Sequence, residues 1–207
     1  MDEESAWRKH ELMQLRLKII SAEPAFREVL IRAGIALNYA HWEGFIKTST
    51  ELLLSFISGA KEKNSTLSTR FIVHSVKSEI ESVINSKNPD HVTESLDSII
   101  ACFEKASNIR TSNYVDTESN LSSKVFDRIA RSVGVDTLAY SHLYPFIDET
   151  ILANRHKIAH GEKTNMSTED YQRISDRVMD LMYQYKSDIE NIAATKSYLR
   201  KDKITIL

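Results

Sequence analysis

The chain has 207 residues, of which 42% are hydrophobic and 27% are charged, the composition of an ordinary globular protein. Its five glycines and three prolines are too few for a protein rich in turns, so we expect long helices and an all-α fold. The formal net charge of −2 argues against a protein that binds nucleic acid over its whole surface, because such proteins usually carry a basic excess. Any RNA contact is therefore expected to be local.

Cysteine usage and the N-terminal sequence bear on the cellular compartment. Cys102 is the only cysteine, so an internal disulfide is excluded, and a lone thiol fits a reducing cytoplasm. The acidic start MDEESAWRKH does not resemble a signal peptide, and no apolar run approaches the roughly 18 residues of a membrane span. We expect a cytoplasmic protein with no membrane partner, folded as a single domain over residues 1–207.

Two long helices are predicted in the first part of the chain. Residues 3–21 carry apolar side chains at helical spacing among charged ones, which indicates an amphipathic helix. Pro24 suits a first helical turn, and the apolar period that follows has no strong break before Gly59. This predicts one helix of about 35 residues, roughly 50 Å long. Such a length favours an elongated helical bundle built on a long hairpin.

Shorter helices are predicted in the middle of the chain. Helical periodicity spans residues 67–84, and another helix is expected over residues 93–105. Residues 108–119 are polar and aperiodic, so a loop is expected there. A further helix over residues 121–132 is predicted to end at Gly134, which suits a left-handed cap.

The last part of the chain holds two more predicted helices. Residues 141–159 form one, which ends near Gly161. Ser167 with Asp170 three residues later resembles a capping box and is expected to begin a long final helix. The tail beyond Tyr198 is basic and then apolar, a pattern that suits docking on a partner.

The sequence RHKIAHG at residues 155–161 is the strongest candidate for chemistry. An arginine binds a phosphate through two donors, and a histidine with an ordinary pKa of about 6.5 transfers protons near neutral pH. On a regular helix Arg155 and His160 lie roughly 140° apart, whereas His156 and His160 lie only about 40° apart. Either the helix ends before Gly161 and His160 turns toward Arg155, or the site is assembled between two chains.

Structural roles compete with the catalytic one. Arg155 could pair with Asp148, seven residues earlier on the same helix face, and His160 could be a cation favoured at a helix C-terminus. Side chains of the long helix are interpreted as structural, with packing roles for Tyr39, His41 and Trp42 and a hydrogen-bonding role for Glu43. The other histidines, at positions 10, 74, 91 and 142, show no ligand spacing, so we expect neither a metal nor a cofactor.

Two separated stretches resemble the HEPN superfamily, the higher eukaryote and prokaryote nucleotide-binding domains. One is ETILANRHKIAHGE at residues 149–162, with an acidic and then apolar approach to the motif and an Ala-His-Gly ending. The other is YAHWEGFIK at residues 39–47, which is similar to the MAE-like branch, and residues 120–136 are similar to that branch in outline. Asn is the commonest residue after the motif arginine in this family, and here that position is His156.

The resemblance implies an all-α, HEPN-like bundle that forms a homodimer, with both motifs lining one cleft. It also implies a metal-independent endoribonuclease in which Arg155 holds the scissile phosphate, His160 is the principal acid and base, and His156 assists. We expect support for this site from Asn154, Glu149 and Asp148, and phosphate contacts from Lys157 and Lys163.

The expected biological setting is a toxin or effector of a bacterial toxin–antitoxin or antiphage system, with RNA and an antitoxin protein as partners. The alternative is a non-catalytic HEPN module that uses the same groove to bind a nucleotide, RNA or a protein. A purely structural helical dimer is a third possibility.

Overall fold

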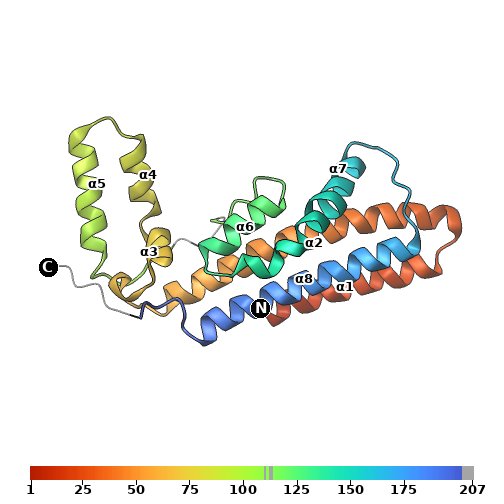
Figure 1. The fold of residues 1–207 in the computed structure, drawn as a ribbon, viewed down its shortest axis with the longest axis horizontal. Helices are drawn as coiled ribbons and strands as arrows, with labels where there is room; N and C mark the ends of the chain where they lie inside the picture. Colours follow the sequence, from red (N-terminus) through yellow and green to blue (C-terminus); the bar gives the residue numbers. More distant parts are fainter. Residues whose placement is uncertain (110, 112–113, 202–207) are drawn as a thin grey trace.

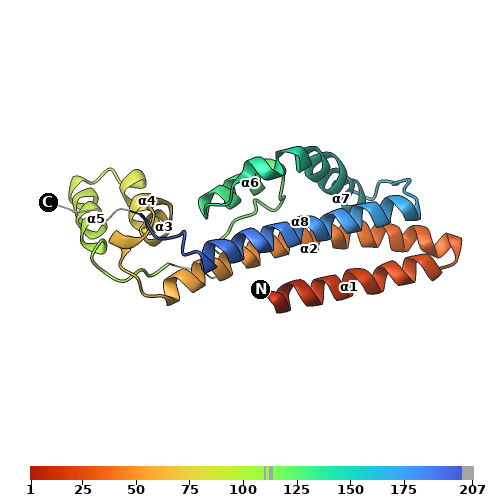
Figure 2. The same cartoon turned by 60° about the horizontal axis from the view of Figure 1, so that its bottom comes forward.

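Three long helices form the elongated body of the protein in the computed structural model, which describes residues 1–109, 111 and 114–201 (Figure 1). They are α1 (Asp2–Ser21), α2 (Pro24–Gly59) and α8 (Thr168–Ala194). Figure 2 shows α1 on one side of the α2–α8 pair, and α6 (Ser123–Ser132) and α7 (Ala153–Ala159) on the other. The all-α, elongated bundle built on a long helical hairpin is thereby confirmed.

The core lies along α2, because its apolar residues recur at helical spacing and its first turn accepts Pro24 without losing a hydrogen bond. Trp42 is fully buried and packs against Phe126 of α6, with ring centroids 5.2 Å apart. The buried hydroxyls of Thr50 and Tyr185 lie 2.7 Å apart and join α2 to α8. The predicted capping box is present at the start of α8, where Ser167 and Asp170 satisfy each other's backbone N–H groups.

A helical hairpin stands out from one end of this body (Figures 1 and 2). After the short 3-10 helix Asn64–Thr66, α3 (Thr69–Ser75) leads into α4 (Lys77–Asn85), and α5 (Pro89–Cys102) returns antiparallel to α4. The prediction of a single helix over residues 67–84 is wrong, because α3 and α4 are separate helices. Val76 leaves the helical conformation, with φ −117° and ψ 19°, and its buried side chain keeps the apolar period intact across the break.

The segment that leads to RHKIAHG is helical, as predicted over residues 141–159, but it is not one regular helix. A 3-10 helix (Thr137–Leu143) is followed by a π-helical stretch (Phe146–Leu152) and then by α7. A π-helical turn holds more residues than an α-helical one, so it changes which side chains share a face. The helix predicted at residues 93–105 also begins earlier, because Asn88 caps α5 and Pro89 occupies its first turn.

Two expectations fall partly or wholly on residues that the structure does not describe. The predicted loop over residues 108–119 includes positions 110, 112 and 113, and the basic and apolar tail includes positions 202–207. Within the described parts of the chain, no helix is long and apolar enough to cross a membrane.

Candidate functional site

Arg155 and His156 meet on one side chain, that of Asn120. Arg155 donates from Nη1 to Oδ1 of Asn120 over 3.0 Å, and Nε2 of His156 lies 2.7 Å from the same oxygen. Because an amide oxygen only accepts hydrogen bonds, Nε2 of His156 must carry its proton. All three side chains are partly buried, so the cluster is held in place and still reaches the surface.

Tyr39 of α2 forms the wall behind this cluster. Its ring is only 3% exposed, and the guanidinium carbon of Arg155 lies 5.1 Å from the ring centroid, within the range of a cation–π contact. The hydroxyl of Tyr39 accepts a hydrogen bond from the backbone N–H of Leu121 over 2.7 Å. Burial raises the pKa of Tyr39 to about 12, helped by the negative charge of Glu43 and opposed by Leu121 and Arg155. Tyr39 therefore stays a neutral phenol that positions Arg155 and the Asn120 loop.

The loop that presents Asn120 has an unusual backbone. Glu118 and Ser119 adopt φ values of 55° and 59°, in the left-handed region that non-glycine residues seldom occupy. Asp116 accepts from the N–H of Glu118 over 2.7 Å, and Arg128 binds the Glu118 carboxylate over 2.6 Å. Backbone conformations of this kind cost about 1 kcal/mol or more each and persist where surrounding contacts enforce them, often at functional sites.

Asp148 supports the same loop and does not pair with Arg155. Its carboxylate accepts from the backbone N–H of Ser123 over 2.7 Å and from the Ser123 hydroxyl over 2.5 Å, at the start of α6. The π-helical stretch explains the difference, because a seven-residue spacing puts Asp148 and Arg155 on one face only in a regular α-helix. Asn154 donates to the carbonyl of Thr150, and Glu149 is exposed to solvent.

Among the described residues, no side-chain hydrogen bond joins His160 to Arg155, His156 or Asn120. His160 is the exposed C-cap residue of α7, and Gly161 follows with φ 76°, a left-handed conformation that ends the helix. Lys157 and Lys163 are exposed nearby in the sequence. Within one chain the structure thus joins Arg155 and His156, and it leaves His160 at the end of the helix.

His41 lies on the other side of α2, toward α1. It is buried, its Nδ1 lies 3.4 Å from Nη1 of Arg8, and its Nε2 lies 2.8 Å from a carboxylate oxygen of Glu11. Burial is the main cause that lowers the pKa of His41, and the positive charge of Arg8 adds to it while Glu11 opposes it. The predicted packing role fits this placement, between α1 and α2 and away from Arg155.

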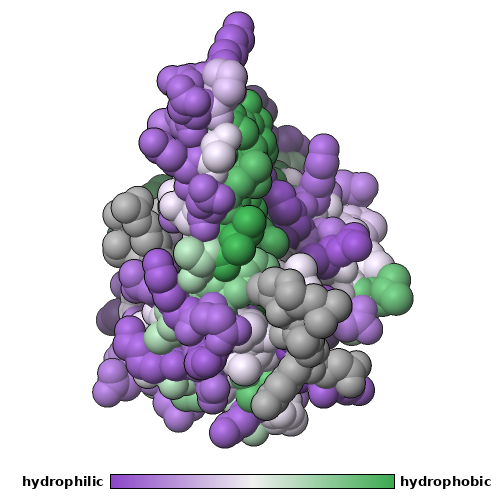
Figure 3. All heavy atoms as spheres, turned by 90° about the vertical axis from the view of Figure 1, so that its left-hand side faces the viewer, coloured by the Kyte–Doolittle hydropathy of each residue, from purple (hydrophilic) through white to green (hydrophobic). Residues whose placement is uncertain are grey.

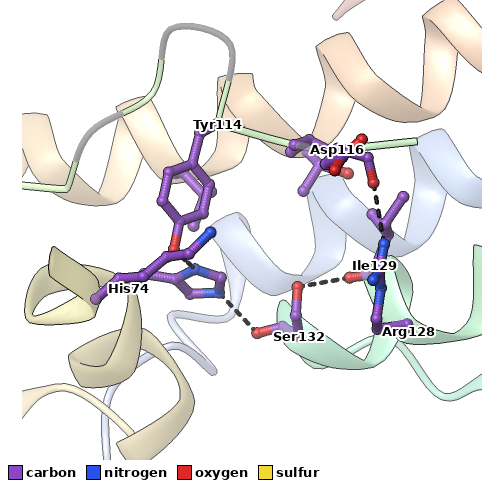
Figure 4. A pocket seen from close by; sticks show the side chains of 10 residues that line it. His74, Tyr114, Asp116, Arg128, Ile129 and Ser132 are labelled. Atoms are coloured by element: carbon purple, nitrogen blue, oxygen red, sulfur yellow. Dashed lines mark hydrogen bonds between the residues drawn. The ribbon is translucent and has the colours of Figure 1, made fainter. Parts of the chain in front are cut away.

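A cavity of about 300 Å³ lies elsewhere, between α2, α6 and the base of the hairpin (Figure 4). His74 lies at its edge, where Nε2 is 3.0 Å from the carbonyl of Ser132 and Nδ1 is 2.9 Å from the hydroxyl of Tyr114. Since a carbonyl only accepts, Nε2 donates and Nδ1 accepts from Tyr114, so His74 connects three segments as a neutral ring. None of the residues predicted for the site lines this cavity.

Asn120 was not predicted as a site residue. It lies 35 positions before Arg155, at the end of an aperiodic polar loop, and no spacing rule connects the two. The one sequence feature that marks its neighbourhood is the outline similarity of residues 120–136 to the HEPN branch.

The family described as RiboL-PSP-HEPN matches residues 3–191. This range includes all of α2 and α7, all of α1 except its first residue, the Asn120 loop and most of α8. No curated protein and no solved structure matches the chain.

Proposed function

We propose that this chain, which belongs to the RiboL-PSP-HEPN family of HEPN domains, is a metal-independent endoribonuclease. The observation that carries the proposal is the convergence of Arg155 and His156 on Oδ1 of Asn120, beside the buried ring of Tyr39. These contacts hold the guanidinium of Arg155 in one orientation before any substrate arrives, which supports a role in binding a phosphate.

Arg155 would hold the scissile phosphate. One of its donors is used by Asn120 and one face of the guanidinium lies over Tyr39, which leaves the other donors for two phosphate oxygens. The fixed positive charge would stabilise the extra negative charge of the five-coordinate phosphorus in the transition state. His156, whose ring is oriented by the same oxygen, would assist this contact.

His160 would transfer the protons. In the proposed reaction the 2′-oxygen attacks the phosphorus while a histidine removes the 2′-hydroxyl proton. The bond from phosphorus to the 5′-oxygen breaks, and that oxygen receives a proton, so the products are a 2′,3′-cyclic phosphate and a 5′-hydroxyl. Exposure at the end of α7 makes His160 accessible to an RNA strand.

The placement of His160 supports a site shared by two chains. On a regular helix Arg155 and His160 lie roughly 140° apart, and His160 is the C-cap residue of α7, which favours a site in which the two residues come from different chains. A two-fold cleft would place Arg155 of one copy opposite His160 of a second. It would also gather Lys157 and Lys163 into a local positive patch, which would reconcile RNA binding with the net charge of −2.

The proposed biological role is that of a cytoplasmic toxin or effector in a toxin–antitoxin or antiphage system, with an antitoxin protein as a further partner. Such a role accords with a small RNA-cleaving domain whose activity must be restrained.

An RNA cleavage assay with a chelator present tests the proposal. We expect the wild-type chain to produce fragments with cyclic-phosphate ends, and Arg155→Ala and His160→Ala each to reduce the rate by about 100-fold or more. His142→Ala removes an exposed histidine of the 3-10 helix Thr137–Leu143, outside the motif, and is the matched control, expected to keep full activity. Undiminished cleavage by either motif variant would exclude the assigned roles.

A non-catalytic binding module is the second candidate. It is favoured by the absence of a side-chain hydrogen bond between His160 and the Asn120 cluster among the described residues, because an oriented arginine alone is enough to hold an anion. For this candidate, wild-type protein would bind RNA in a filter assay, would lose affinity on Arg155→Ala, and would never cut. Overproduction would then leave cell growth unchanged.

A further inference from the structure

The α4–α5 hairpin is poorly covered by the rest of the molecule. None of the residues of α4 is buried, and Ser95 is the only buried residue of α5. Figure 1 shows the pair extending away from the long body, joined to it through α3. Two helices alone provide little apolar core, so a hairpin in this position normally gains stability from a further contact.

The two helices touch each other through small polar side chains. The hydroxyl oxygens of Ser82 and Ser95 lie 3.0 Å apart, and the Ser82 hydroxyl lies 3.3 Å from Nδ1 of His91. On a regular helix Val92 and Ile99 lie within about 60° of Ser95 and are half-buried, whereas Leu96 and Ile100 lie about 100° and 140° from it and are exposed. Ile84, Leu96 and Ile100 are therefore left toward solvent.

These side chains form one surface, here called the hairpin stripe. Its members are the exposed Ile84 of α4 and the exposed Leu96 and Ile100 of α5, with the half-buried Ile80 and Val83 of α4. Ile84 is 73% exposed, Leu96 is 46% exposed and Ile100 is 61% exposed. Figure 3 shows hydrophobic side chains in a continuous stripe along the protruding part of the molecule, bordered by hydrophilic ones. A continuous apolar stripe with a polar border is typical of a binding surface, whereas scattered apolar residues are not.

The charges around the stripe are mostly negative. Between residues 77 and 102 the hairpin carries five carboxylates and two lysines. The carboxylates belong to Glu79, Glu81, Asp90, Glu94 and Asp97. A second copy docked by two-fold symmetry would bring this acidic border against itself, which like-charge repulsion disfavours. A partner with a basic border is complementary to it.

We propose that the hairpin stripe is the docking surface for an amphipathic helix of another protein, one whose apolar face is bordered by Lys and Arg. Such a helix would lie along α4 and α5 and complete a three-helix arrangement, as amphipathic helices do in apolar grooves. The 14 residues of α5 span about 21 Å, so a partner helix of roughly 14 to 18 residues would cover the stripe. The proposal does not depend on the role of Arg155.

Two designed peptides provide the probe, because the partner itself is unidentified. Both are helical, fluorescein-labelled and have Leu on one face, and they differ only in Lys or Glu at the bordering positions. With the full chain, we expect the Lys peptide to bind with a Kd in the micromolar range and to weaken as salt is added. The Glu peptide is expected to bind at least about tenfold more weakly, as measured by fluorescence anisotropy.

Variants of the stripe locate the binding. Leu96→Ser combined with Ile100→Ser should weaken the Lys peptide by about tenfold or more, since the two variants remove both exposed apolar side chains that α5 contributes to the stripe. Leu138→Ser removes a leucine that is 79% exposed outside the hairpin, and it is the matched control with unchanged binding. Equal melting temperatures for all variants would show that the fold is intact.

Three results would overturn the proposal. The first is equal affinity for the two peptides, which would mean that the stripe binds apolar helices without regard to their charge. The second is binding that the double variant leaves unchanged. The third is self-association of the chain that Ile100→Ser abolishes, which would assign the stripe to a second copy. RNA cleavage is expected to be unchanged in the stripe variants, so failure here is distinguishable from failure of the proposed ribonuclease.

Discussion

Asn120 holds the candidate site together at the level of single residues. Its Oδ1 is the only atom that both Arg155 and His156 contact among the hydrogen bonds of the described residues. Asn120→Ala should therefore lower kcat of RNA cleavage by about 10- to 100-fold, because loss of orientation by an ångström costs rates of that order. Single-turnover cleavage of a short RNA measures this effect.

Asn120→Asp distinguishes orientation from general damage. The carboxylate keeps an acceptor for Arg155 and His156, so kcat should remain close to the wild-type value, whereas the added negative charge beside the phosphate should raise KM. Asn165→Ala, at an exposed loop position, is the control for loss of an asparagine. Equal losses of kcat in the Ala and Asp variants would contradict a positioning role for Asn120.

His41 leads to a prediction about stability and pH. Burial lowers the pKa of His41 in the folded chain below its ordinary value of 6.5, so the unfolded chain binds a proton more readily. The contribution of neutral His41 is complete above about pH 6.5 and is lost as pH falls toward the folded pKa. We expect the free energy of unfolding in urea to decline from pH 7 to pH 5, and less steeply in His41→Gln.

His74 contributes to the same decline, because burial also lowers its pKa. The double variant His41→Gln, His74→Gln should accordingly show a flatter pH dependence than either single variant. If removing both histidines leaves the slope between pH 5 and pH 7 as it is in the wild type, buried neutral histidines are not its source.

The contacts of single residues also show which part of the site could not be predicted from the sequence. The pairing of Arg155 with a distant amide depends on a loop in which Glu118 and Ser119 adopt left-handed backbone conformations. Glycine is the residue type that predicts such a conformation, so these two positions give no sign of it in the sequence. A local pattern identified the motif at residues 155–161, because the chemistry of Arg and His is visible in one short segment. Its actual partner, Asn120, is brought in by tertiary structure.

At the scale of elements, long periodic helices were predictable and their interruptions were not. The run from Pro24 to Gly59 is one helix as expected, since its apolar period is unbroken and its ends carry suitable residues. The break at Val76 and the π-helical stretch at Phe146–Leu152 keep apolar residues buried, so the period continues through both. The π-helical stretch turns Asp148 away from Arg155, so Asp148 binds Ser123 and Arg155 binds Asn120.

The close approach of α2 and α8 leads to a prediction at the same scale. Gly34 lies against Tyr171, and an added Cβ would come within 2.5 Å of Cε2 of that ring. Gly34→Ala should therefore destabilise the fold by about 1 to 3 kcal/mol, as overpacked cores do. Thermal unfolding followed by circular dichroism measures the change.

Gly59 is the matched control for Gly34. A Cβ there meets nothing within 4 Å, so Gly59→Ala should leave stability unchanged or raise it by about 0.5 kcal/mol through reduced chain entropy. A Gly34→Ala protein as stable as Gly59→Ala would mean that the two helices do not pack as closely as the contact with Tyr171 requires.

At the scale of the whole molecule, the two proposed surfaces lie toward opposite ends of the long body. The motif helix α7 lies near one end of the α2–α8 pair, and the α4–α5 hairpin extends from the other (Figure 1). A second copy bound at α7 and a helix bound at the hairpin would therefore not compete for the same space. The hairpin partner could remain bound while the proposed dimer forms, which suits a contact that recruits or restrains the chain without blocking the proposed cleft.

The proposed shared cleft leads to a prediction about dimers. Arg155→Ala and His160→Ala chains, each inactive alone, are coexpressed with different tags and purified as mixed dimers. In a mixed dimer one half of the cleft pairs an intact Arg155 from one copy with an intact His160 from the other, so about half of the wild-type activity should return. If both groups act within one chain, every copy still lacks one of them and the mixed dimer stays inactive. Activity of the mixed dimer would therefore mean that the arginine and the histidine that act on one phosphate come from different chains. An inactive mixed dimer would mean that they come from the same chain.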